Sequence, residues 1–73
     1  MNNLITRIRN AANPNTMWGE AIIISIDNGV SDQELIDTLK SQAADEPIVM
    51  ISVLGSALVD ELLIGVPLTR KLF

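Results

Sequence analysis

The sequence predicts an all-α fold, a small bundle of about four helices built by a single domain over residues 1–73. Apolar residues recur at helical spacing in several segments, recognisable helix caps separate those segments, and a chain of 73 residues makes one domain at most. An α/β alternative stays open, in which the β-branched stretches 22–26 and 48–54 are parallel strands of a βαβ unit completed by a second chain.

The first two predicted helices cover residues 3–12 and 14–28. In the first helix the apolar residues fall on one stripe, and its two arginines lie off that stripe. Asn13 and Pro14 suit the start of the second helix, because asparagine is a strong N-cap and proline is tolerated at the first helical position. Gly29 is typical of a helix end, since glycine adopts the left-handed conformation at little cost.

The third predicted helix begins at the stretch Ser31-Asp32-Gln33-Glu34, which fits a capping box. In such a box the Ser31 hydroxyl accepts a hydrogen bond from the N–H of Glu34, and the Glu34 side chain reaches back to Ser31. The helical spacing then directs one set of apolar side chains inward. These are Leu35, Ile36, Leu39 and Ala43.

The fourth predicted helix runs from Glu46 to about Gly65, with Asp45 as its cap, and it is apolar on nearly every face. A helix of this kind must be covered on every face. We therefore expect it to lie at the centre of the bundle and to form part of a self-association surface, where small residues let a second helix approach closely. That surface comprises Ile51, Ser52, Gly55, Ser56 and Val59.

Composition favours association with other chains. Apolar residues make up 48% of the sequence and aromatic ones only 3%, so a small globule has much aliphatic surface to hide. The chain has no cysteine for disulfides and no histidine for the commonest metal sites. We expect homo-oligomers, with a dimer favoured, and no metal or cofactor.

Charge disfavours nucleic acid as a partner. The formal net charge is −4, whereas a nucleic-acid binder normally carries a basic footprint. Ser25, Gly29, Val30 and Leu35 do fall in the register of a helix-turn-helix. The first turn after that corner, however, carries Asp32 and Glu34, whose carboxylates would be repelled by phosphates. We therefore interpret the corner as a junction between two packed helices, and keep a small DNA-binding regulator as an alternative.

No motif predicts an enzyme. Nucleophilic catalysis has neither histidine nor cysteine to draw on, and no glycine-rich phosphate loop is present. The pair Asp60-Glu61 is expected to form an exposed strip or an ion pair with one of the basic residues near the two ends of the chain. Those residues are Arg7, Arg9, Arg70 and Lys71.

The sequence favours a protein-binding role in the cytoplasm. The longest uncharged run, Pro47 to Val59, is shorter than the about 20 residues that a membrane span needs. We predict a non-enzymatic interaction module that acts on a larger protein as adaptor, antirepressor or inhibitor, like accessory proteins of phages and plasmids. A structural subunit of a homo-oligomeric assembly is a further alternative. The predicted partner contacts are Met17, Trp18, Val66, Leu68, Leu72 and Phe73.

Overall fold

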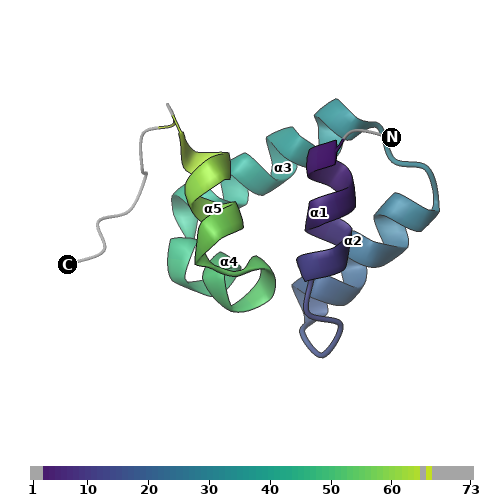
Figure 1. The fold of residues 1–73 in the computed structure, drawn as a ribbon, viewed down its shortest axis with the longest axis horizontal. Coiled ribbons are helices and arrows are strands. Elements are labelled where there is room, and N and C mark those ends of the chain that lie inside the picture. Colours follow the sequence, from purple (N-terminus) through teal and green to yellow (C-terminus); the bar gives the residue numbers. More distant parts are fainter. Residues whose placement is uncertain (1–2, 65, 67–73) are drawn as a thin grey trace.

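Five helices build the part of the chain that the computed structural model describes, residues 3–64 and 66 (Figure 1). They are α1 (Asn3–Ala11), α2 (Met17–Asp27), α3 (Asp32–Asp45), α4 (Pro47–Leu54) and α5 (Ser56–Leu63). No strand occurs among these residues, so the all-α prediction is confirmed and the α/β alternative is wrong. None of the five helices is long and apolar enough to cross a membrane.

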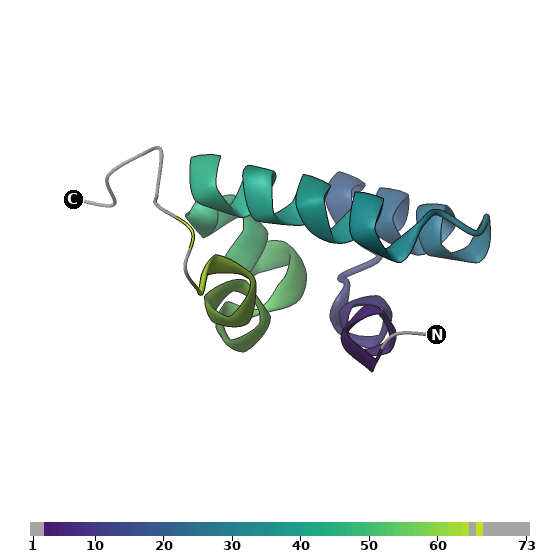
Figure 2. The same cartoon turned by 90° about the horizontal axis from the view of Figure 1, so that it is seen from above.

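The helices form two layers (Figure 2). One layer holds α2 and α3, and the other holds α1, α4 and α5. Along its shortest axis the molecule measures 16 Å, close to the about 15 Å expected for the Cα atoms of two packed helix layers. Helix α2 packs on α1 and α4, whereas α3 packs on α4 and α5. Because both helices bury the side that meets the second layer, their exposed sides share one broad face, called here the α2–α3 face.

The core between the layers is aliphatic. All five helices contribute to it, and no polar or charged side chain of the described residues is buried. In α3, three of the four residues predicted to point inward are buried, namely Leu35, Leu39 and Ala43, and Ile36 is half-buried against the core. The most deeply buried large side chains are Ile5, Ile8, Leu39, Met50, Val59 and Leu62.

Helix α2 begins later than predicted, at Met17. Its N-cap is Thr16, whose hydroxyl accepts a hydrogen bond of 2.9 Å from the N–H of Gly19. Asn13 instead belongs to the turn before the helix, where its carbonyl accepts from both the N–H and the hydroxyl of Thr16. The N–H of Asn13 donates to the carbonyl of Val53 and so fastens this turn to α4.

The corner between α2 and α3 follows the predicted chemistry. Gly29 has a φ of 83°, and it follows the C-cap residue Asn28. The N–H of Gly29 donates to the carbonyl of Ile26 and that of Val30 to Ser25, which is the hydrogen-bond pattern of a Schellman motif. Little direct packing joins α2 and α3 beyond the corner, because each helix packs on the other layer.

The start of α3 is confirmed in its main feature. Ser31 is the N-cap, and its hydroxyl accepts a hydrogen bond of 3.3 Å from the N–H of Glu34. The acidic side chains of the first turn, Asp32 and Glu34, lie where the helix dipole is positive.

The single helix predicted over residues 46–65 is wrong, because the chain breaks at Gly55. Gly55 adopts φ 90° and ψ 155°, a region of backbone space that is essentially restricted to glycine. The break turns α5 back, so that α4 and α5 pack on each other and both pack on α3. Two short apolar helices can thus bury their sides in one core, which a continuous helix apolar on every face could not do. Asp45 ends α3 instead of capping α4.

Candidate functional site

An apolar stripe runs along the exposed side of α2. Met17, Ala21 and Ile24 are spaced at i, i+4 and i+7, so they lie on one side of the helix. Met17 is 91% exposed and Ile24 is 51% exposed, and Ala21 between them is exposed as well. The opposite side of α2 buries Ile22 and Ile26. The helix is therefore apolar both toward the core and toward solvent.

Shallow hollows flank this stripe. Met17, Trp18 and Ala21 line one of about 230 Å³, where the half-buried Trp18 also packs against the core. Another, of about 340 Å³, extends from the turn before α2 along the helix as far as Ile24 and includes Glu20. The stripe and its hollows together form a surface into which apolar side chains of another molecule can fit.

Acidic side chains are exposed on the α2–α3 face, which also carries the stripe. Glu20 is exposed on α2, and Glu34 and Asp37 are exposed on α3. Asp37 accepts a hydrogen bond of 2.7 Å from the side-chain amide of Gln33, which leaves its charge in place. Nine acidic and three basic residues lie within 3–64 and 66, a formal charge of −6 for that part of the chain.

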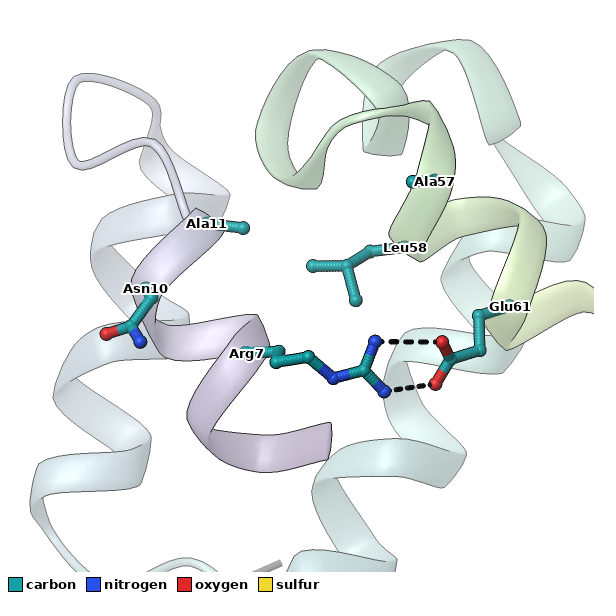
Figure 3. A pocket seen from close by; sticks show the side chains of 6 residues that line it. All are labelled: Arg7, Asn10, Ala11, Ala57, Leu58 and Glu61. Atoms are coloured by element: carbon teal, nitrogen blue, oxygen red, sulfur yellow. Dashed lines mark hydrogen bonds and ion pairs between the residues drawn. The ribbon is translucent and has the colours of Figure 1, made fainter. Parts of the chain in front are cut away.

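Two arginines of α1 are engaged in bidentate ion pairs with neighbouring helices. Arg9 donates to both oxygens of Asp27 at 2.9 Å, which joins α1 to the end of α2. Arg7 donates to both oxygens of Glu61 on α5, at 2.9 and 2.6 Å (Figure 3). The predicted pairing of the Asp60-Glu61 segment with an arginine is thus confirmed for Glu61.

These hydrogen bonds favour the ionised form of the paired carboxylates. Hydrogen bonds from Arg7 lower the pKa of Glu61, and hydrogen bonds from Arg9 lower the pKa of Asp27. A general acid at neutral pH needs a raised carboxyl pKa, so the direction of both shifts is opposite to that requirement.

An open groove of about 400 Å³ separates α1 from α5 beside the Arg7–Glu61 pair. Leu58 points into it from α5, and Ala11 and Ala57 form small parts of its walls (Figure 3). This groove lies between helices of the second layer and is separate from the α2 stripe. In the described residues, no three histidine, cysteine, aspartate or glutamate side chains come together closely enough to hold a metal ion.

The structure brings two of the predicted partner contacts together, Met17 and Trp18 in the first turn of α2. Val66 is half-buried, and its N–H donates to the carbonyl of Leu63 at 2.9 Å. The other three predicted contacts lie outside the described residues. They are Leu68, Leu72 and Phe73.

The predicted self-association residues lie in different environments. Ser52, Gly55 and Ser56 are exposed and Ile51 is half-buried, whereas Val59 belongs to the core at 1% exposure.

Sequence reasoning missed the most exposed apolar residues of α4. Ile48 is 64% exposed, and Val49 beside it is also exposed. The Ser52 hydroxyl donates to the carbonyl of Ile48 at 3.2 Å, so it is satisfied within its own helix. The exposed side of α4 therefore offers an uncharged, mainly apolar surface.

Ala21 and Ile24 were missed as well, although their spacing from Met17 is visible in the sequence.

A scan against protein-family models, a search of curated proteins and a search of solved structures each find no match for this chain.

Proposed function

We propose that this protein is a non-enzymatic interaction module that binds a larger protein through the exposed side of α2, as an adaptor, antirepressor or inhibitor. The observation that carries this proposal is the stripe of Met17, Ala21 and Ile24, with Met17 91% exposed beside the half-buried Trp18. Isolated apolar side chains are ordinary on protein surfaces, but a contiguous stripe with adjoining hollows is typical of an interaction site.

The residue types suit this role. Methionine is flexible and polarisable, and it adapts to partner surfaces of different shape. Tryptophan is enriched among the residues that dominate binding energies at protein interfaces. A stripe spaced at i, i+4 and i+7 is the pattern by which a helix docks into an apolar groove or against a second helix. Met17, Trp18, Ala21 and Ile24 would supply the contacts.

The charge distribution argues against the DNA-binding alternative. In a helix-turn-helix, the first turn of the second helix approaches bases and phosphates. Here that turn belongs to α3 and exposes the carboxylates of Asp32 and Glu34. These charges would be repelled by a phosphate backbone.

Self-association is a second candidate function, supported by a different surface. The exposed side of α4 presents Ile48 and Val49, and its one hydroxyl, on Ser52, is already satisfied. Burial of these side chains against a second copy would remove apolar surface from water without desolvating a charge. This surface would serve a homodimer or a larger structural assembly.

The two surfaces can be distinguished by matched substitutions. Three tagged versions of the chain are used to capture partners from a lysate of the source organism. They are the wild type, Ile24→Glu and Ile48→Glu. Both isoleucines are more than half exposed, at 51% and 64%, so glutamate leaves the core intact. We expect Ile24→Glu to lose a stoichiometric partner that the wild type and Ile48→Glu retain.

The outcomes separate the candidates. Retention of the same partner by all three proteins would refute α2 as the docking surface. Loss of the partner only with Ile48→Glu would show that the docking surface lies on α4 instead of α2. Loss of self-association by Ile48→Glu, measured by sedimentation, would support the homo-oligomer. Circular dichroism of each variant checks that the helices are retained.

A further inference from the structure

We infer that the partner segment bound on the α2–α3 face is a cationic amphipathic helix, with an apolar stripe bordered by lysine or arginine. This inference rests on the proposed docking function of α2. It follows from two features that the fold places on the same face of the molecule. One is the apolar stripe of Met17, Ala21 and Ile24, and the other is the acidic exposed side of α3.

The two-layer arrangement is what places these features together. Helices α2 and α3 lie in one layer, and each buries the side that contacts the other layer (Figure 2). Their solvent-facing sides consequently point in the same direction. A helix bound against Met17 and Ile24 would therefore extend over a surface that also carries Glu34 and Asp37.

Glu20 and Glu34 supply negative charge to this face. No ion pair within residues 3–64 and 66 neutralises the carboxylate of Glu20 or Glu34. Arg9 is occupied by Asp27, and Arg7 lies in the other layer, occupied by Glu61. Lys40 is the one basic side chain of α3.

The charge and polarity of this face indicate what kind of partner segment would fit it. Charges at the rim of an interface steer encounters and reject partners of like charge, while the apolar centre supplies most of the affinity. An apolar stripe on a face that also carries exposed carboxylates fits a segment with apolar and basic residues. It disfavours nucleic acid and anionic lipid surfaces, both of which attract basic proteins.

The test uses two synthetic amphipathic helical peptides with the same leucine stripe. One carries lysines beside the stripe, and the other carries glutamates. Each is titrated into the full chain by calorimetry and by ¹⁵N-resolved NMR, at low and high salt. We expect the lysine peptide to bind about tenfold or more tightly than the glutamate peptide, and to weaken in high salt as rim charges are screened. The shifted resonances should belong to α2 and α3.

A charge-reversed variant sharpens the result. Glu20→Lys combined with Glu34→Lys should reduce or invert the preference between the peptides, while Asp60→Lys on α5 should leave it unchanged. Equal affinity for the two peptides would overturn the inference while leaving α2 as an apolar docking surface. Shifts confined to the α1–α5 groove, failure of both peptides to bind, or binding of DNA or anionic vesicles would also overturn it. The lysate capture with Ile24→Glu tests the docking function independently of these peptides.

Discussion

Replacing Gly19 with alanine tests how the start of α2 is built. Gly19 is buried in the first turn of the helix, directly above the turn that contains Asn13. A Cβ at this position would lie 1.8 Å from the carbonyl oxygen of Asn13 and 2.7 Å from the hydroxyl oxygen of Thr16. The first of these atoms is backbone, so it cannot rotate away as a flexible side chain would.

Helix propensity and packing predict opposite signs for this substitution. In a helix interior, alanine is favoured over glycine by about 1 kcal/mol. Here the Asn13 carbonyl would have to move, and it accepts hydrogen bonds from the N–H and the hydroxyl of Thr16. Each is worth about 1 kcal/mol and overpacking costs roughly 1–3 kcal/mol, so we expect a net destabilisation of about 2–4 kcal/mol. A chain of this size is stable by only about 4–11 kcal/mol.

Urea unfolding followed by tryptophan fluorescence measures the effect, because Trp18 is the only tryptophan and adjoins the substitution. With a slope of about 1 kcal/mol per molar urea, the midpoint should fall by about 2–4 M. Ala21→Gly, on the exposed side of the same helix, is the matched control and should cost about 1 kcal/mol from propensity alone. An unchanged or raised midpoint for Gly19→Ala would refute the reasoning.

Three further substitutions test other parts of the structure. The pKa of Glu61 is lowered in the folded state, so its pairing with Arg7 stabilises the fold above the ordinary glutamate pKa of about 4.3 and is lost as the pH falls. Arg7→Gln should therefore flatten the acid dependence of the urea midpoint, and an identical acid profile would contradict this. Ser31→Ala should cost about 1 kcal/mol through loss of the N-cap of α3, whereas an effect near zero in urea unfolding would show the cap to be dispensable. Leu39→Ala should cost about 2–5 kcal/mol because its side chain is fully buried, and a calorimetric loss below about 1 kcal/mol would contradict its central place in the core.

The helix α3 could be predicted from the sequence because its signals are local. The Ser31 cap depends on residues within one turn, and the apolar spacing from Leu35 onward specifies the buried side without knowledge of the rest of the fold. Both features reappear in the structure as predicted. The Gly29 corner could be predicted for the same reason, because the preference for a left-handed glycine after a helix is also local.

The break at Gly55 could not be predicted in this way. A glycine within an apolar run is compatible with a continuous helix, at a cost of about 1 kcal/mol. What decides between the two conformations is the packing of α5 against α3 and α4, which involves residues distant in the sequence. The start of α2 has a similar origin, since the turn at Asn13 is fastened by its hydrogen bond to Val53.

The candidate site was partly predictable. Met17 and Trp18 were recognisable as large apolar residues near a helix start, and the structure places both at the surface hollows of α2. Ile24 is not identified from the sequence, because α2 carries apolar residues on both its buried and its exposed side, and periodicity alone does not assign Ile24 to one of them. Only the packing of α2 on α1 and α4 distinguishes the two sides.

The contacts of α5 with α3 and α4 could be made within one chain or between two chains, depending on the conformation of Gly55. If the backbone at this residue became helical, α4 and α5 would join into one rod, and α5 could no longer fold back onto α3 of its own chain. Two such chains could restore every contact by exchanging their α5 helices, as in a domain-swapped dimer. Gly55→Ala removes access to the φ of 90° and favours the helical state, so size-exclusion chromatography should show more dimer for this variant than for wild type. On this reasoning, the backbone torsion of Gly55 would decide whether the hydrophobic core is completed within one chain or between two.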